Sequence, residues 1–435
     1  MTIMKTLLNV LLILTAVIWS NAQTPVPANA QSRPIALTGA VAHLGNGQVI
    51  NNSVIGFDKG KLTIVADATT NPNLSGYEVI NITGKHVYPG FILPNSTVGL
   101  QEVTAIRAMN DNAERGDINP NVRSIISYNT DSEYAPTYRF NGVLLAETTP
   151  TSGIISGSSS VVEMDGWNWE DAAHSVDIGI HLNWPPLIRR QFDFNTFTFG
   201  ESPNRDYDKQ VGDLGLFFAE AQAYGSQSVK EANLKFDAVQ GLFDGSKVLF
   251  IHAGSQKEII ESVRFAQRHG IKRITMLAGT AAYWVADFLK ESNIPVILPD
   301  PHNLPDRPDD DVDMPFRLPA LLTQAGVQVS LSNAGALHGG RNLGFFAGTA
   351  AAYGLSKEDA LKTITSNTAK ALGIDKRVGT LEVGKDATLF VSEGDALDYR
   401  TNNLSHAFIS GKQITLPGNQ QELYERYSRK YGQMK

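Results

Sequence analysis

The side chains in this sequence best suited to acid–base or metal chemistry are histidines that stand at or after short apolar runs. His252 and His181 end two such runs, His302 follows a third two residues after Asp300, and His338 follows a fourth. If these runs are parallel strands, their carboxyl ends meet at one face, where Asp300, His302 and His338 join His252 to bind a divalent ion or transfer protons. The alternative is that each histidine hydrogen-bonds a neighbour and does no chemistry. We expect the remaining histidines on the surface or in terminal β structure: His43, His86, His174, His269 and His406.

Several reaction classes are excluded by what the sequence lacks. The absence of cysteine excludes disulfides, thiolate nucleophiles, thiolate metal sites and iron–sulfur clusters. There is no Gly-x-Ser-x-Gly pattern to activate a serine, and no Gly-x-Gly-x-x-Gly pattern to bind a dinucleotide. The glycine- and serine-rich stretch at 152–160 lacks the Gly-Lys-Ser/Thr ending of a phosphate-binding loop, so we expect a tight turn there.

Composition and the first residues predict an exported, acidic protein. Among 435 residues, 37 are Lys or Arg and 44 are Asp or Glu, a formal net charge of −7 that argues against nucleic-acid binding through a basic surface. Lys5 precedes an apolar run at 7–19, and small residues around Ala22 are typical of a cleavage site, so residues 1–22 are predicted to be a signal peptide. The run is shorter than the roughly 20 residues that span a bilayer. We therefore expect a soluble periplasmic or extracellular protein with no membrane span after cleavage.

The middle of the chain alternates between two patterns. Short β-branched apolar runs predict buried parallel strands at 248–253, 274–277, 295–298 and 327–331. Helical periodicity lies between them, at 256–268, 281–291 and 318–325. Strand–helix units at this spacing indicate a parallel α/β fold, and residues 89–375 have the length of an eight-stranded barrel.

Short strand patterns with turn signals occur at both ends of the chain. They are expected at 36–43, 54–58 and 62–65, and again at 387–391 and 406–409. We predict an α/β fold, a (β/α)8 TIM-type barrel with a small β-sandwich domain built from both chain ends. The expected boundaries are a flexible leader at 23–34, the composite β domain at 35–88 and 376–415, and a C-terminal tail at 416–435.

Four segments resemble the amidohydrolase superfamily, in particular its imidazolonepropionase-like members. Residues 84–92 (GKHVYPGFI) resemble the motif that leads into the barrel of that superfamily, and residues 378–389 (VGTLEVGKDATL) resemble the motif that leads out. Residues 366–373 (SNTAKALG) and 277–283 (LAGTAAY) are similar to a helix and a strand end between them. The resemblance covers about residues 35–411 and implies the same barrel and β-sandwich.

The resemblance also implies a metal centre at the barrel mouth. Superfamily members bind one or two divalent ions there, which activate water to hydrolyse C–N and related bonds. The corresponding positions carry Asn95 and Thr97 on the first strand, His252 on the fifth, Ala278 on the sixth and Asn333 on the eighth. Only His252 is a good zinc or iron ligand, and Asn333 cannot serve as a general base. We therefore predict a pocket at former ligand positions and no bound metal.

Two functional hypotheses follow. In the first, the chain is an exported amidohydrolase-superfamily protein with a degenerate metal site, a pseudoenzyme that binds a small-molecule ligand, forms a homo-oligomer or pairs with an intact relative. In the second, it is an active hydrolase of amide or cyclic C–N bonds that uses a relocated metal, such as zinc, or a metal-free site around His252, His302 and His338. No cofactor is expected under the first hypothesis.

Overall fold

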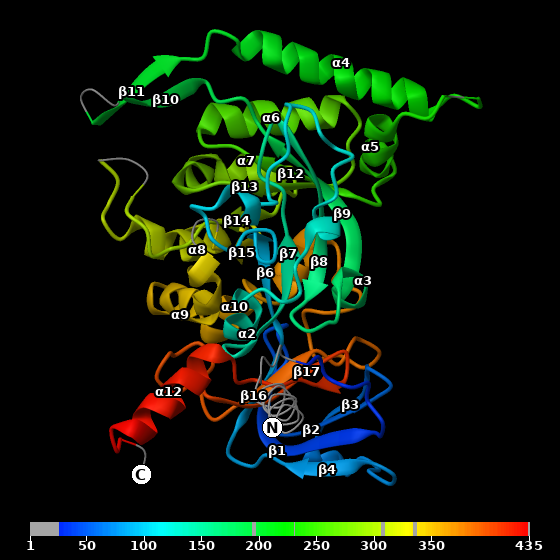
Figure 1. The fold of residues 1–435 in the computed structure, drawn as a ribbon, viewed down its shortest axis with the longest axis vertical. Coiled ribbons are helices and arrows are strands. Elements are labelled where there is room, and N and C mark those ends of the chain that lie inside the picture. Colours follow the sequence, from blue (N-terminus) through cyan, green and yellow to red (C-terminus); the bar gives the residue numbers. More distant parts are fainter. Residues whose placement is uncertain (1–25, 194–196, 230, 306–308, 334–336, 434–435) are drawn as a thin grey trace, which may run out of the picture.

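The computed structural model describes residues 26–193, 197–229, 231–305, 309–333 and 337–433. A barrel wrapped by helices fills the upper part of the molecule in Figure 1, and a β-sheet built from both chain ends lies below it. The predicted signal peptide lies outside the described residues. No helix in the described ranges has the length and apolar character that a membrane span requires.

Eight strands form the barrel sheet and confirm the predicted fold class. In sheet order they are β15 (Val329–Leu331), β14 (Val296–Leu298), β13 (Ile274–Leu277), β12 (Val248–His252), β9 (Ala173–Asn183), β8 (Ile155–Glu163), β7 (Val143–Thr148) and β6 (Phe91–Ser96). The four strands predicted from apolar runs are β12 to β15, and they pair in parallel as expected.

One barrel strand departs from the predicted parallel pattern. β8 runs antiparallel to both β7 and β9, and it includes most of the stretch at 152–160 for which a tight turn was expected. That expectation was wrong because serine and glycine, which favour turns in exposed segments, are here buried and hydrogen-bonded. Ser158 donates to the Pro120 carbonyl at 3.1 Å, for example, and Ser124 donates to the Ser158 carbonyl at 3.2 Å. Satisfied hydroxyls make a serine-rich strand tolerable inside a protein.

The barrel is nearly closed, because a loop bridges the seam between β6 and β15. The Ile92 amide donates to the Ile364 carbonyl at 2.9 Å, and the Leu331 amide donates to the Thr363 carbonyl at 3.0 Å. Across the same seam, Ser332 Oγ donates to the Pro94 carbonyl at 2.7 Å. The chain segment before α11 therefore takes the place of a direct strand-to-strand ladder.

Helices cover the outside of the barrel and one of its ends. Their bounds are α2 (Tyr134–Arg139), α3 (Trp169–Ala172), α4 (Tyr207–Gly225), α5 (Leu234–Asp244), α6 (Gln256–Arg268), α7 (Ala286–Glu291), α8 (Met314–Ala325), α9 (Leu343–Ala352), α10 (Lys357–Lys362), α11 (Ser366–Leu372) and α12 (Asn419–Lys430). Short 3-10 turns are η1 (Ala68–Thr70), η2 (Arg107–Met109), η3 (Ser124–Ser127), η4 (Thr280–Val285) and η5 (Leu337–Asn342). α11 plugs the barrel at the amino ends of the strands, where Ala369 and Leu372 pack with Ile92 and Phe250.

The helix predictions were confirmed to different degrees. α6 has the predicted bounds because Ser255 and Glu258 form a capping box that fixes its start. The helix expected at 281–291 is divided into η4 and α7, and the one expected at 318–325 begins earlier, at Met314. Pro315 in the first turn of α8 explains the early start, since proline favours that position.

The lower sheet joins strands from both ends of the chain around its own core. Its strands are β1 (Ile35–His43), β2 (Val49–Asp58), β3 (Lys61–Asp67), β4 (Glu78–Asn81), β5 (His86–Pro89), β16 (Leu389–Ser392), β17 (Leu404–Ile409) and β18 (Lys412–Gln413). β16 pairs antiparallel with β5, which links the two ends. Leu37, Phe57, Leu389 and Phe408 are among the buried side chains of this core.

Buried polar contacts fasten the lower sheet and the chain ends to the barrel. Asp386, just before β16, contacts His174 of β9, Arg377 and Lys61 of β3. In the leader, the Ala28 amide donates to Asp165 at 2.9 Å.

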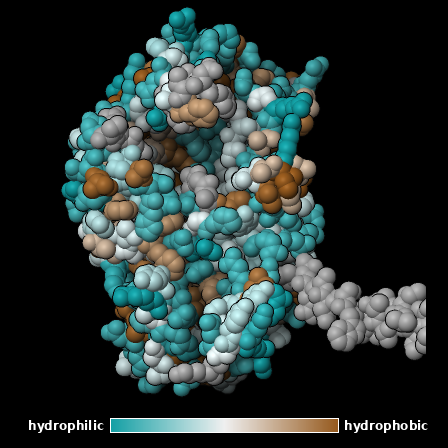
Figure 2. Space-filling view, turned by 60° about the vertical axis from the view of Figure 1, so that its left-hand side comes forward, coloured by the Kyte–Doolittle hydropathy of each residue, from teal (hydrophilic) through white to brown (hydrophobic). Residues whose placement is uncertain are grey.

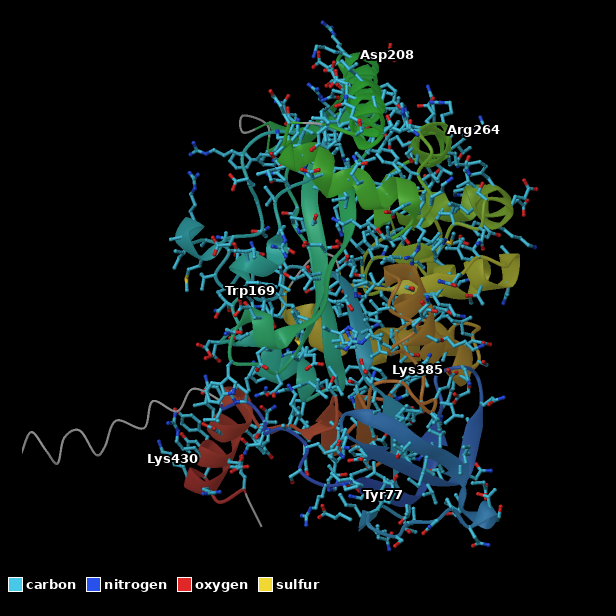
Figure 3. All side chains as sticks on the ribbon, turned by 90° about the vertical axis from the view of Figure 1, so that its right-hand side faces the viewer. Tyr77, Trp169, Asp208, Arg264, Lys385 and Lys430 are labelled. Atoms are coloured by element: carbon cyan, nitrogen blue, oxygen red, sulfur yellow. The ribbon has the colours of Figure 1, made fainter. Side chains whose placement is uncertain are left out.

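The C-terminal segment that was predicted to be a tail contains helix α12. Figure 3 shows Tyr77 of the lower sheet and Lys430 of α12 at the end of the molecule opposite Asp208 and Arg264.

The remaining pair of strands forms a ribbon apart from both sheets. β10 (Ile188–Asp193) and β11 (Thr198–Pro203) pair antiparallel and project beside α4 in Figure 1.

The face of the molecule in Figure 2 is mainly hydrophilic, with its hydrophobic residues in small separate groups. Scattered groups of this kind are ordinary for a protein surface.

Candidate functional site

Two adjoining cavities lie where the barrel strands end. The first has a volume of about 350 Å³ and is mainly apolar, because residues at and after the ends of β12, β13 and β14 line most of it. Its lining consists of Asn95, His252, Ala253, Gly254, Leu277, Ala278, Gly279, Ile297, Leu298, Pro299 and Ser332. In barrel proteins this end of the strands carries the functional residues.

The second cavity, of about 320 Å³, is polar. It is lined by Asn95, Ser96, Thr97, Gln101, Asn112, Tyr138, Pro150, Thr151, Asn183, His252, Asn333 and Leu337. Asn95 and His252 line both cavities, so the two spaces meet at these side chains. Among the described residues, no Lys, Arg, Asp or Glu lines either one. The mouth of the barrel is therefore lined by amide, hydroxyl, imidazole and apolar groups.

The five positions expected to correspond to metal ligands come together at this mouth. Asn95, His252 and Ala278 line the apolar cavity, and Thr97 and Asn333 line the polar one. Strand geometry accounts for the convergence, because each position stands at or just after the carboxyl end of a barrel strand.

The residues expected to form a relocated site lie elsewhere. His302 Nε2 is 2.8 Å from Thr349 Oγ1, and the His302 ring meets the edge of Phe346. Asp300 accepts a hydrogen bond from the His302 amide, and His338 packs against Tyr134 with ring centroids 5.1 Å apart. None of Asp300, His302 and His338 is among the described residues that line the two cavities. Loop residues after a strand can point in many directions, and the contacts of these three are with residues other than His252.

His252 is instead held by a chain of buried groups that reaches across three strands. Its Nε2 lies 3.0 Å from Nδ1 of His181 on β9, and Nε2 of His181 lies 3.0 Å from Oε1 of Glu147 on β7. His181 and Glu147 are completely buried, and His181 stacks on Phe250. Sequence reasoning found His181 as a candidate but missed Glu147. The available signal was a single carboxylate within the apolar run at 143–148.

Glu147 also joins this chain to the cavity wall. Ser159 Oγ donates to Oε1 of Glu147 at 2.7 Å, and the backbone N–H of Asn95 donates to Oε2 at 2.8 Å. Asn95 has a φ of 51°, a left-handed conformation that is uncommon for residues other than glycine. The carboxylate therefore helps to hold Asn95 in the strained backbone that places it between the two cavities.

The direction of these hydrogen bonds fixes what His252 can offer a ligand. Because Glu147 accepts, Nε2 of His181 carries a proton, and Nδ1 of a neutral His181 accepts from Nε2–H of His252. A neutral His252 then keeps a lone pair on Nδ1. Although part of its ring faces the cavities, burial on the other sides lowers the pKa of His252 to about 3. At neutral pH His252 is an uncharged hydrogen-bond acceptor.

The potential for metal binding can be judged from the donor groups. Across the described ranges, no three His, Asp or Glu side chains are grouped so that they could hold a metal ion. At the mouth, the five positions that correspond to ligands supply a single imidazole, two amides, one hydroxyl and a methyl group.

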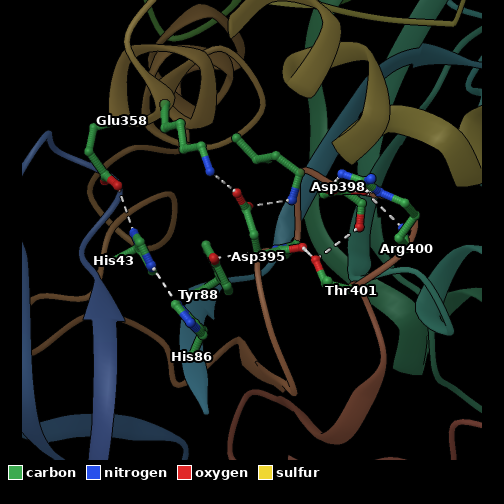
Figure 4. Close-up of polar contacts among 11 residues, drawn as sticks. His43, His86, Tyr88, Glu358, Asp395, Asp398, Arg400 and Thr401 are labelled. Atoms are coloured by element: carbon green, nitrogen blue, oxygen red, sulfur yellow. Dashed lines mark hydrogen bonds and ion pairs between the residues drawn. The ribbon is translucent and has the colours of Figure 1, made fainter. Parts of the chain in front are cut away.

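The other histidines only partly follow the sequence expectation. His174 was expected on the surface or in the terminal β structure, but it is buried on barrel strand β9 and contacts Asp386 at 3.2 Å. His43 and His86 do lie in the lower sheet. Figure 4 shows His43 between Glu358 and His86, with contacts of 2.6 Å and 3.0 Å. This cluster joins the lower sheet to α10 and lies apart from the barrel mouth.

Comparisons with known proteins agree with this architecture. The sequence profile of the Amidohydrolase family matches residues 172–414, more than half of the chain. The chain therefore belongs to the amidohydrolase family, as the motifs predicted. No curated protein matches the chain.

Solved structures show the same fold at low sequence identity. An amidohydrolase from Thermotoga maritima MSB8 superposes with a TM-score of 0.74 at 22% identity, covering 88% of this chain and 99% of its own. Phenylurea hydrolase B gives 0.54 at 13% identity, covering 88% and 97%. An adenosine deaminase from Xanthomonas campestris, solved with bound zinc, gives 0.50 at 13%, covering 94% and 99%. At these identities the likeness concerns the fold alone.

Proposed function

We propose that this amidohydrolase-family protein binds an uncharged small molecule at the barrel mouth and has lost the metal centre of its family. The observation that carries the proposal is the chemistry of the two cavities, which are lined by neutral groups throughout the described residues. A charged ligand would lose its hydration there without gaining a counter-charge.

Loss of the metal centre is supported by the state of the one remaining imidazole. His252 already shares Nε2 with His181, and neighbouring positions carry Asn95, Thr97, Ala278 and Asn333. Zinc sites need three or four imidazole, carboxylate or thiolate ligands directed at one point. The residues present do not fit such an ion, so no step of the proposed function passes through a metal.

The division of the mouth into two cavities suggests the kind of ligand. An apolar portion would lie against Leu277, Ile297 and Leu298, and a polar portion would face the hydroxyl and amide groups of the other cavity. Neutral amides, ureas and cyclic amides combine these two features, and their N–H groups can donate to His252. Most small-molecule sites have this mixture of apolar walls and a few polar groups.

Metal analysis tests this proposal first. Protein purified without a His tag is equilibrated with zinc, iron(II) or manganese in turn, desalted and measured by elemental mass spectrometry. We expect far less than one ion per chain in every case. A near-stoichiometric ion that is lost in His252→Ala would overturn the proposal.

Ligand binding is tested by calorimetry with matched pairs of compounds. Small cyclic amides and aryl ureas are compared with analogues that carry a carboxylate or an ammonium group at the same place. We expect binding of neutral members only, and weaker binding to Asn95→Ala. Tighter binding of the charged analogues would contradict the proposed ligand class.

A second candidate function is metal-free hydrolysis of an amide or cyclic C–N bond. The observation in its favour is the hydrogen-bonded chain from Glu147 through His181 to His252, which resembles the arrangement that orients a catalytic histidine. A pKa of about 3 makes His252 a weak base at neutral pH, which favours binding over catalysis. Turnover of a neutral amide that disappears in His252→Ala would favour this second function, and unchanged turnover would exclude the role of His252.

We also propose that the protein is exported and loses residues 1–22. The support is the sequence pattern of Lys5, the apolar run and the small residues that follow it. Amino-terminal sequencing of protein from periplasmic and culture fractions tests this. Intact Met1 on protein in the cytoplasm would contradict it.

Association with another barrel is a further part of the proposal. A degenerate member of an enzyme family can retain its scaffold while a second copy or an intact relative supplies catalysis. Light scattering of the purified protein and a pull-down from native periplasm test the two arrangements. A monomer that never recovers a second amidohydrolase-family protein would contradict both.

A further inference from the structure

A third cavity, at the opposite end of the barrel, is lined by four cationic residues. This cavity of about 340 Å³ lies at the amino ends of β12 to β15. Lys272 and Arg273 precede β13, Lys290 is in the last turn of α7, and Lys370 is in the last turn of α11. No Asp or Glu is among the described residues that line it. The cavity is therefore basic in a chain whose formal net charge is −7.

The four cations have no carboxylate partners in the described part of the chain. No ion pair or side-chain hydrogen bond involves Lys272, Arg273, Lys290 or Lys370, although Arg273 is half-buried. By contrast, the buried Arg139 is paired with Asp165. The cavity also offers neutral polar groups on Ser292, Asn293 and Gln328.

Helix termini account for some of this positive charge. Side-chain atoms of Lys272, Lys290 and Arg273 lie over Gly245, Gly326 and Gly373, the residues that end α5, α8 and α11. Each helix carboxyl terminus carries about half a negative charge. The ends of α5, α8 and α11 therefore offset part of the positive charge. Among the described residues, the lining still has four cationic residues and no carboxylate, in a space large enough for a small molecule.

We propose that this basic cavity binds a small phosphate-type oxyanion with at least two negative charges, such as pyrophosphate or a phosphate monoester. The planar guanidinium of Arg273 can donate two parallel hydrogen bonds to such a group, and the lysines act as mobile point charges around it. This site is distinct from the mouth cavities: its ligand is anionic, and binding there does not depend on the proposed function.

Calorimetry and thermal unfolding at constant ionic strength test the proposal. Pyrophosphate is titrated into the full-length protein against sodium chloride of equal ionic strength, and inorganic phosphate and glucose 6-phosphate are compared with it. We expect saturable binding of at least one of the three phosphates and a matching rise in Tm, because a ligand that binds only the folded state stabilises it.

Matched charge variants distinguish a built site from general attraction. Arg273→Gln and Lys290→Gln should each weaken binding about tenfold or more, since each removes a charge-assisted contact. Lys430→Gln removes the same charge from exposed α12 and should bind like the wild type. If Arg273→Gln fails to fold, Lys290→Gln carries the test, because that lysine is exposed.

Two results would overturn the proposal. One is an identical Tm and no binding heat with all three phosphates relative to chloride at the same ionic strength. The other is equal weakening by Lys290→Gln and Lys430→Gln, which would show nonspecific attraction. A loss of stability in the variants without any phosphate effect would mean that the cations only stabilise helix ends.

Discussion

Glu147 receives three hydrogen bonds on its two carboxylate oxygens while its side chain is completely buried. We expect Glu147→Gln to lower the free energy of unfolding by about 2 kcal/mol. The NH2 group of glutamine would replace one carboxylate oxygen, so this buried donor would face a second donor, such as the Asn95 backbone N–H or Ser159 Oγ, instead of accepting from it. Urea denaturation measures the change. Glu220→Gln, at an exposed position of α4, is the matched control and should change stability little. Equal effects of the two substitutions would contradict the assigned role of Glu147.

His252 gives the barrel mouth a dependence on pH. Its pKa is lowered from 6.5 to about 3, so the unfolded chain binds a proton that the folded chain does not. The stabilising contribution of the neutral ring is present above pH 6.5 and is lost as pH falls from 6.5 toward 3. We expect the free energy of unfolding to fall by up to about 1.4 kcal/mol per pH unit from this group. In His252→Gln that part of the decline should be absent, as measured by urea denaturation at pH 5 and pH 7.5.

Single residues also show where sequence reasoning about the site succeeded and where it failed. Asn95, Thr97, Ala278 and Asn333 meet His252 because strand ends converge, and a motif aligned to a strand end carries that information. The contact of His181 with Glu147 depends on the register between β7, β8 and β9, which no local pattern records. Loop residues such as His302 took partners from nearby helices instead.

At the scale of elements, Asp386 connects barrel strand β9 with strands from both chain ends. Burial alone would raise the pKa of Asp386, but hydrogen bonds from His174 and Lys61 and the charge of Arg377 outweigh it and lower the pKa to about 2. We expect Asp386→Asn to lower the free energy of unfolding by about 2 kcal/mol, less than for a fully buried pair because Lys61 and Arg377 are partly exposed.

The control for this substitution is Asp398→Asn. Asp398 also has a pKa lowered to about 2 by hydrogen bonds from Arg400, but Arg400 is exposed to solvent and Asp398 is partly exposed. Pairs near the surface contribute little, so the change should be much smaller than in Asp386→Asn. Guanidinium unfolding of both variants checks the comparison, and a larger loss in Asp398→Asn would contradict it.

The elements themselves differ in how far the sequence predicts them. β12 to β15 and α6 could be predicted because apolar β-branched runs and a capping box are local signals. β8 could not, since its Ser and Gly residues favour a strand only when neighbouring strands bury their hydroxyls and supply partners. Its antiparallel direction follows from the short connections to β7 and β9, which leave no room for a crossover helix.

At the scale of the whole molecule, the lower sheet needs both ends of the chain, whereas α12 adds little to the core. Ending the chain after residue 385 removes β16 to β18 and exposes the core of the lower sheet, so we expect insoluble or unfolded protein. Ending it after residue 417 removes α12, of which only Ser428 is buried, and should leave a folded protein. Circular dichroism and solubility of the two truncations check this difference. A folded protein ending at residue 385 would contradict it.

The seam between β6 and β15 has a consequence for how the mouth can be observed in solution. The backbone amides of Ile92 and Leu331 donate to the carbonyls of Ile364 and Thr363, and the mouth residues Asn95 and Ser332 lie three residues and one residue further along the chain, respectively. Each opening of the seam releases these two amides to solvent, so their hydrogen–deuterium exchange rates count its opening events. A ligand that bridges Asn95 and Ser332 must slow both rates together, which makes this pair of amides a built-in reporter of occupancy.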